Sequence, residues 1–255
     1  MMGIFSYIII FTLLGSVVSL VGGLILLFKE KLVLKISHFL TSFAAGALLS
    51  AAFFDLLPEA QEYIEETGVD INIPFWILIG ILIFFLLERF IHHHHSHGDK
   101  KEEEKSIIPL VVIGDTMHNF TDGMAIAATF LVSIPLGIVT SLAVAAHEIP
   151  QEIGDFGLML HKGMARKKVL LINIFSSLAA MIGAILTVIL RESIEGLLPV
   201  VLALTSGFFI YIALANLIPE IHSQDNQKVA FWETVSLLIG VTVVYFAIST
   251  LEGAH

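Results

Sequence analysis

The stretch Asp115–Gly123, which reads DTMHNFTDG, and the stretch His147–Asp155, which reads HEIPQEIGD, place polar side chains inside long apolar segments. An ionisable side chain at the centre of a bilayer costs roughly 2.5 to 3.5 kcal/mol, so such clusters persist where they bind or conduct something. The charged groups of both stretches are carboxylates, and the apolar segments carry no Lys or Arg in their interiors. We therefore expect a bound cation to supply the missing charge.

The composition is that of a polytopic membrane protein. Of the 255 residues, 56% are apolar and 14% charged, which is too apolar for a soluble domain. The first apolar run, residues 4–28, is longer than a signal-peptide core and lacks an A-x-A-like cleavage site, so we interpret it as a membrane span. The absence of cysteine excludes thiolate metal ligands, and the net charge of −10 argues against nucleic-acid binding.

Eight segments are apolar over the roughly 20 residues that a membrane-spanning helix needs. The predicted spans are residues 4–28, 36–57, 73–91, 107–132, 135–161, 168–190, 197–219 and 230–250. We expect an all-α membrane protein with a single transmembrane domain over residues 1–255. Twelve of the thirteen Lys and Arg residues follow odd-numbered spans, and only Arg191 lies in an opposite loop. The positive-inside rule then predicts that the loops after odd-numbered spans are cytoplasmic. Both termini would lie on the outer side of the cytoplasmic membrane.

Two predicted loops have a composition suited to metal ions. The outer loop between spans 2 and 3 contains five acidic residues: Glu59, Glu62, Glu65, Glu66 and Asp70. It is either a plain solvated loop or an acidic rim that concentrates cations. The cytoplasmic loop 92–105 begins with HHHHSH at His92–His97 and continues into a Lys/Glu run. This composition favours a flexible segment able to chelate metal, with a plain spacer as the alternative.

Spans 2 and 7 end in a similar way, in DLLPE at residues 55–59 and NLIPE at residues 216–220. The two Pro-Glu pairs lie 161 residues apart, and the same shift moves the start of span 1 close to the start of span 6. Corresponding helices are five spans apart, so the two copies have opposite orientations. We expect a 3+2+3 inverted repeat with a binding site near the membrane midplane.

Spans 4 and 5 bring their polar residues to the same depth. The connection around Ser133–Pro135 is very short, so the two helices are antiparallel. Residues four apart lie on one helix face, about 6 Å apart along the axis. Asp122 is then level with His147, and His118 with Gln151.

Imidazole, carboxylate and amide donors in one patch suit Zn²⁺, and also Fe²⁺, Mn²⁺, Co²⁺ or Cd²⁺. With Asn119 and Glu148 alongside, the four corner residues could surround one ion or two neighbouring ions. Asp122 and Glu148 would neutralise one divalent ion. Three further acids could orient the ligands, form a second ion site or accept protons: Glu152, Asp155 and Asp115. The alternative is a hydrogen-bonded helix interface with protonated acids.

The two stretches resemble the fourth-span HNxxDG-like and fifth-span HExPHExGD-like motifs of the ZIP family of zinc and iron transporters, in a prokaryotic-type member. The resemblance covers essentially the whole chain. It implies eight spans, both termini outside, and transport of divalent metal toward the cytoplasm, commonly by a homodimer with an elevator-like motion of the central helices. The metal is then substrate, and no cofactor or enzymatic activity is expected.

The resemblance also implies roles for single residues. The metal ligands that carry over are His118, Asn119, Asp122, His147 and Glu148. Gln151 departs from the motif, which has a second His there, so the metal preference stays open. The residues that look like pathway groups are Asp55 and Asn216, with Glu59 and Glu220 after them.

Two other functions fit parts of the same pattern. A metal-gated or metal-conducting channel would need the same midplane ligands. An intramembrane zinc protease would use H-E-x-x-H, in which two His bind zinc and the Glu is the general base. Here HEIPQ lacks the last His, and Pro150 interrupts the helix. The sequence therefore favours the transporter.

Overall fold

The computed structural model describes residues 3–93, 100–222 and 227–252, and these residues form helices and short connections without a strand. The predicted all-α class is confirmed. The long helices are α1 (Ile4–Ala51), α3 (Ile73–His93), α4 (Lys100–Val132), α5 (Ile134–His161), α6 (Arg166–Ile189), α8 (Leu198–Tyr211) and α10 (Gln227–Glu252). The shorter ones are η1 (Ala52–Leu56), α2 (Leu57–Thr67), α7 (Arg191–Ile194), η2 (Glu195–Leu197), η3 (Ile212–Leu217) and α9 (Ile218–His222).

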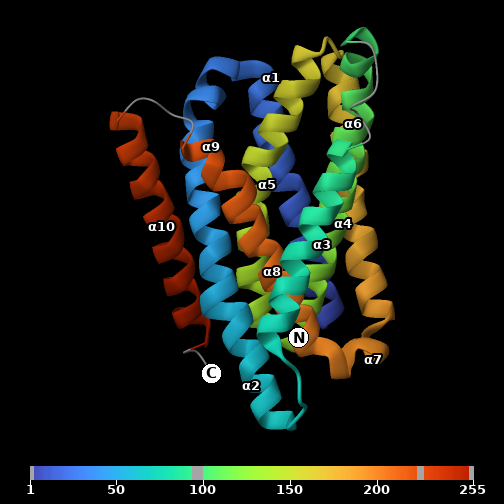
Figure 1. Ribbon diagram of the computed structural model, residues 1–255, viewed down its shortest axis with the longest axis vertical. Helices are drawn as coiled ribbons and strands as arrows, with labels where there is room; N and C mark the ends of the chain where they lie inside the picture. The colour runs from blue at the N-terminus through green and yellow to red at the C-terminus, as the bar shows by residue number, and fades with distance from the viewer. Residues whose placement is uncertain (1–2, 94–99, 223–226, 253–255) are drawn as a thin grey trace.

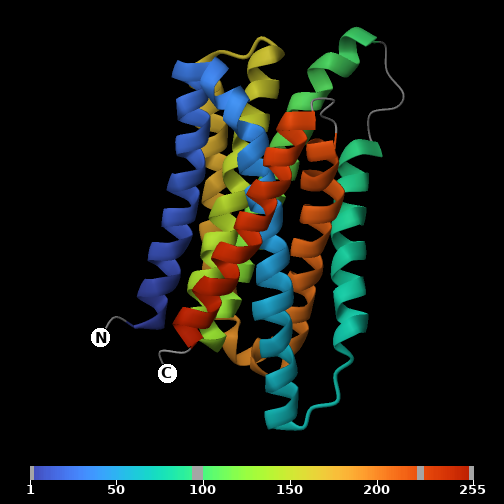
Figure 2. The same cartoon turned by 90° about the vertical axis from the view of Figure 1, so that its left-hand side faces the viewer.

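Helix α1 contains the first predicted span and most of the second, which continues through η1 to the first residue of α2. Figures 1 and 2 show it doubling back near the top of the bundle, so that its dark-blue and light-blue arms run in opposite directions. The sequence predicts a connection at residues 29–35, but the backbone there stays helical. This stretch contains no Gly or Pro, and its Leu, Lys and Glu residues are good helix formers.

The acidic segment after span 2 is a helix, where the sequence predicts a loop. Helix α2 continues directly from η1 and has Pro58 in its first turn. It ends at Gly68, which adopts a positive φ of 67° and donates its N–H to the carbonyl of Ile64 at 2.9 Å. A proline at the start and a left-handed glycine after the end are typical helix boundaries. Four of the five acidic residues therefore lie in a short helix at the end of the bundle (Figure 1), and Asp70 follows it.

The predicted His-rich loop is shorter than residues 92–105. Helix α3 continues to His93 and α4 begins at Lys100, because the Lys/Glu run is made of strong helix formers. The remaining part of this prediction, residues 94–99, lies outside the described residues.

Both chain ends lie at the same end of the bundle, at the bottom of Figures 1 and 2. The bend of α1 and the short connection between α5 and α6 lie at the opposite end. By length and apolar composition, five described segments are candidate membrane spans: Ile4–Ile25, Ile36–Thr67, Arg166–Ile189, Leu198–Leu217 and Gln227–Leu251. The eight-span count and its orientation stay predictions.

Glycines allow two close helix crossings. A Cβ on Gly46 of α1 or Gly240 of α10 would collide with a backbone carbonyl of the other helix. Gly80 of α3 and Gly207 of α8 make the same kind of contact with each other's helices. Gly207 follows Gly46 by 161 residues, and Gly240 follows Gly80 by 160, so the two crossings occupy corresponding places along the chain.

Candidate metal site

Four buried side chains from α4 and α5 converge near the middle of these two helices. His118 and Asp122 come from α4, and His147 and Glu148 from α5, with ligand atoms that all lie within 4.8 Å of one another. Their exposed fractions are 8%, 5%, 0% and 3%. The antiparallel arrangement brings Oδ2 of Asp122 to 3.2 Å from Nε2 of His147, as the sequence predicts.

The local sequence fixes this antiparallel pairing. Only Ser133 separates α4 from α5, and its hydroxyl caps α5 by accepting a hydrogen bond from the N–H of Leu136 at 3.3 Å. Pro135 follows in the first turn, where its fixed φ suits a helix start. So tight a connection makes the two helices antiparallel neighbours that contact each other.

The separations between the ligand atoms are close to the edges of a tetrahedral zinc site. Nε2 of His118 lies 2.9 Å from Nε2 of His147 and 3.6 Å from Oε1 of Glu148. It lies 3.7 Å from Oδ2 of Asp122. Ligand atoms about 2.0 to 2.1 Å from a tetrahedral zinc are about 3.3 Å from one another. The observed values scatter around this length, so small side-chain shifts would accommodate an ion.

The imidazole of His147 is oriented for metal binding. Its Nδ1 lies 3.2 Å from the carbonyl oxygen of Ala143, which can only accept a hydrogen bond. Nδ1 therefore carries the proton, and Nε2 offers its lone pair toward His118. Metal-bound His residues commonly donate their other N–H to a carbonyl in this way. Two imidazole nitrogens at such a short separation either share a proton or bind one cation together.

The site has an excess of negative charge. Within the described ranges, both carboxylate oxygens of Glu148 and Oδ2 of Asp122 are buried without a hydrogen-bond partner. Every Lys and Arg whose side chain the structure describes is at least partly exposed. A buried carboxylate costs several kcal/mol unless an opposite charge compensates for it. A divalent cation among these four side chains would supply that compensation.

A search for related proteins agrees with this chemistry. The family described as "ZIP Zinc transporter" matches residues 3–109 and 105–247. The chain belongs to the ZIP zinc transporter family. It is 31% identical to zinc transporter ZIP13 of Pongo abelii over 216 residues, which cover 80% of this chain and 65% of that protein. It is 39% identical to zinc transporter ZIP10 of Danio rerio over 123 residues, 48% of this chain and 14% of that protein.

A third relative is zinc transporter ZIP4 of Mus musculus, 38% identical over 138 residues, which cover 53% of this chain and 21% of that protein. The chain thus spans less than two thirds of the length of these curated relatives. Family membership and the long apolar helices together establish a multi-pass membrane protein.

Two further predicted ligands of this family member lie beside the four-residue group. The amide nitrogen of Asn119 donates to Oδ1 of Asp115 at 2.9 Å and to the backbone carbonyl of Asp115 at 3.1 Å. Only the amide oxygen of Asn119 is then free to bind a cation. Gln151 lies one turn beyond His147 on α5 and is partly exposed.

Three acids lie on the same two helices, toward the end of the bundle where α1 bends. Asp115 is 5% exposed, and its Oδ1 accepts a hydrogen bond from the amide nitrogen of Asn119 at 2.9 Å. Glu152 is fully buried, and neither of its carboxylate oxygens has a hydrogen-bond partner in the part of the chain that the structure describes. Asp155 is partly exposed. The row of acidic residues therefore continues along α4 and α5.

The predicted pathway residues lie on two π-helical turns and the helices after them. Asp55 is 3% exposed in η1, and Glu59 is partly exposed in α2. Asn216 is exposed in η3, and Glu220 lies in α9, where its side chain is outside the described residues. Sequence reasoning missed both π-helical turns. Pro58 and Pro219, which come shortly after these turns, are the signal of irregular backbone there.

Aromatic rings beside the two His residues were also missed. The ring centroid of Phe84, from α3, lies 5.5 Å from that of His118. The ring centroid of Phe209, from α8, lies 6.3 Å from that of His147. Both residues belong to continuous apolar runs, which give no signal that one ring faces a polar site.

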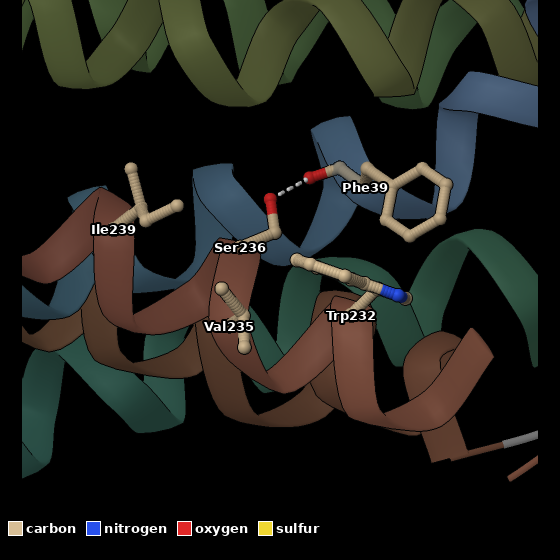
Figure 3. Close-up of a pocket in the computed structure, with 5 residues that line it drawn as sticks. All are labelled: Phe39, Trp232, Val235, Ser236 and Ile239. Carbon is tan, nitrogen blue, oxygen red and sulfur yellow. Dashed lines mark hydrogen bonds between the residues drawn. The ribbon is translucent and has the colours of Figure 1, made fainter. Parts of the chain in front are cut away.

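A groove on the outside of the bundle lies apart from these residues. It runs between α1 and α10, has a volume of about 360 Å³, and is lined by Phe39, Trp232, Val235, Ser236 and Ile239. Figure 3 shows the hydroxyl of Ser236 donating to the backbone carbonyl of Phe39, at 2.7 Å. This contact joins the two helices, and the largely apolar lining offers no set of metal ligands.

Proposed function

We propose that this protein carries divalent metal ions, with zinc as the principal substrate, across the cytoplasmic membrane. The observation that carries the proposal is the buried group of His118, Asp122, His147 and Glu148. Four of its ligand-atom separations are 2.9 to 3.7 Å, and all of them are within 4.8 Å. The set combines two neutral nitrogen donors with two carboxylates, which suits a borderline divalent ion and leaves it formally neutral. Several relatives of this chain are named zinc transporters.

We place eight spans in the membrane, with both termini outside and the metal moving toward the cytoplasm. The distribution of Lys and Arg supports this orientation, because twelve of thirteen follow odd-numbered spans. The common end of the two chain termini is what an even number of crossings requires (Figure 2).

An inverted repeat relates the first three spans to the last three. The two glycine crossings support this plan, as do η1 and η3, which precede Pro58 and Pro219. The hydroxyl of Ser16 in α1 also lies 3.5 Å from the carbonyl of Ser177 in α6, its counterpart 161 residues later. In transporters built from inverted repeats, the substrate binds near the midplane, where the repeats meet.

The remaining polar residues complete the proposed path. Asn119, through its amide oxygen, and Gln151 would add ligands at the edge of the site. Three acids would orient the ligands or hold a second ion: Asp115, Glu152 and Asp155. Four more polar residues would line the path: Asp55, Glu59, Asn216 and Glu220. Fe²⁺, Mn²⁺, Cd²⁺ and Co²⁺ are further candidate substrates, and the protein would work in the bilayer as a homodimer.

Zinc uptake into liposomes containing the purified protein tests this proposal. Wild-type protein is compared with Asp122→Ala and with Met117→Ala, whose side chain is 40% exposed on the same helix. We expect zinc to enter with wild type and Met117→Ala, and uptake to fall to background with Asp122→Ala. Uptake that saturates with zinc and remains slow indicates a carrier, and flux that rises in proportion to the gradient indicates a channel. Equal uptake by wild type and Asp122→Ala would refute the site.

A further inference from the structure

Phe84 differs from the residues around it on α3. Its neighbours Leu82, Ile83, Phe85 and Leu86 are 40% to 49% exposed, as expected for side chains that face the lipid. Phe84 is 7% exposed and points into the bundle instead. Gly80, one turn earlier, allows α3 to approach α8 closely at this level, because a side chain there would collide with the α8 backbone. The close approach seats the Phe84 ring between α8 and the ion site.

The Phe84 ring packs directly on His118. The two ring centroids are 5.5 Å apart and the ring planes are nearly perpendicular, at 87°. On its other sides Phe84 contacts two rings of α8, with centroids 5.5 Å away at Phe208 and 5.7 Å away at Tyr211. Perpendicular aromatic pairs at this distance contribute roughly 0.5 to 1.5 kcal/mol beyond burial of their area, so the contact favours one orientation of the imidazole.

The two imidazoles of the site are held by different means. His147 donates Nδ1–H to the carbonyl of Ala143, which fixes the plane of its ring. Among the described residues, the polar contacts of the His118 ring instead involve Nε2, the atom that would bind the ion: Nε2 of His147, Oδ2 of Asp122 and Oε1 of Glu148. No polar contact from the described part of the chain therefore holds the far side of the His118 ring, and packing has to fix its orientation.

We propose that Phe84 is a positioning residue for metal binding. It acts through His118: its ring holds the imidazole with Nε2 turned toward the other three ligands. With Phe208 and Tyr211 it also closes the α3/α8 side of the site with apolar surface, which keeps water from competing for the ion. The inference rests on the proposed function, since it takes His118 to be a metal ligand.

Cobalt binding to the purified protein in detergent tests this inference without transport. Tetrahedral Co²⁺ gives a visible absorption band whose position and intensity report ligand geometry. The variants are Phe84→Ala, Phe84→Leu, which keeps most of the volume without the flat ring, and Phe85→Ala, which removes an outward-facing ring. Residues that orient metal ligands typically change metal affinity by about 10- to 100-fold. We expect both Phe84 variants to weaken cobalt binding by about tenfold and to alter the band, and Phe85→Ala to behave as wild type.

His118→Ala separates the two possible failures. Cobalt binding by His118→Ala with wild-type affinity and an unchanged band would overturn the proposed function itself. If His118→Ala loses the band while Phe84→Leu binds cobalt with wild-type affinity and spectrum, only the positioning role is wrong. Should Phe84→Ala fail to fold, as judged by size-exclusion chromatography, Phe84→Leu decides the question alone. Restoration of the band by Phe84→Leu would mean that filling the volume suffices and that the ring has no positioning role.

Discussion

Nε2 of His118 and Nε2 of His147 lie 2.9 Å apart, although the two residues are 29 positions apart in the chain and belong to different helices. Both atoms are buried beside two carboxylates. A shared proton would hold the imidazoles together in a neutral pair, and a shared cation would also neutralise Asp122 and Glu148. The second arrangement satisfies more of the buried charge, which is why the His pair is the centre of the proposed site.

Replacing either member of this pair should nearly abolish metal transport. We expect His118→Ala and His147→Ala each to lower zinc uptake at limiting zinc by more than about tenfold, since even the partners that orient a ligand cost 10- to 100-fold in affinity. Both variants should keep wild-type expression and elution on size-exclusion chromatography. The other four predicted ligands, two acids and two amides, can still bind water. Uptake measured in liposomes provides the check, and normal uptake by both variants would contradict the assignment.

The arrangement of α4 and α5 could be predicted because it depends on local signals. The short connection at Ser133 forces the helices to be antiparallel, and the four-residue spacings put each set of donors on one face. The contact between Asp122 and His147 follows from these two facts, and the structure confirms it. Four of the six predicted ligands form the compact group, while Asn119 and Gln151 lie beside it and their roles stay predictions.

Features that depend on tertiary packing could not be predicted. The sequence around Phe84 is a uniform apolar run, so nothing in it distinguishes the one ring that faces His118, 34 positions later. The acidic segment after span 2 was expected to be a loop because its charges suggest solvent. Charged residues are also good helix formers, and Pro58 and Gly68 supply both ends of α2.

The close crossings at Gly46 and Gly207 should be sensitive to a single methyl group. We expect Gly46→Ala and Gly207→Ala each to destabilise the protein by about 1 to 3 kcal/mol, because the added Cβ collides with a backbone carbonyl that cannot move alone. Gly15→Ala in α1 is the control, since a Cβ there meets no atom within 4 Å. It should be neutral or slightly stabilising, because alanine favours helix over glycine.

Thermal unfolding in detergent, followed by intrinsic fluorescence, measures this difference. The corresponding positions of Gly46 and Gly207 predict losses of similar size. A melting temperature for Gly46→Ala at or above that of wild type would show that the two helices can separate slightly without cost.

Deleting His92–His97 should leave the maximal transport rate within about twofold of wild type. The segment begins with the last two residues of α3 and follows the predicted span 73–91, outside the predicted hydrocarbon region, so it cannot belong to a site in the middle of the bundle. Its imidazoles could still raise the local concentration of metal, so the apparent affinity or the regulation of uptake should change. Uptake over a range of zinc concentrations distinguishes the two parameters. Loss of all transport by a deletion variant that elutes and melts like wild type would contradict this prediction.

Replacing Gln151 with His should shift the metal preference toward zinc. Gln151 lies one turn beyond His147 and offers a neutral amide oxygen, a weak and hard donor. An imidazole nitrogen at the same position favours zinc over manganese under the usual affinity order and leaves the site charge of −2 unchanged. Gln151→His should therefore lower the apparent KM for zinc relative to manganese.

The same change should slow the maximal rate of zinc transport, because an ion that binds more tightly is released more slowly, and transport requires binding that is not too strong. Zinc and manganese uptake are measured in parallel with wild type, Gln151→His and Gln151→Asn, the last of which keeps an amide and controls for side-chain shape. We expect Gln151→Asn to keep the wild-type ratio of zinc to manganese uptake. If all three proteins are active and Gln151→His also keeps that ratio, Gln151 does not face the ion.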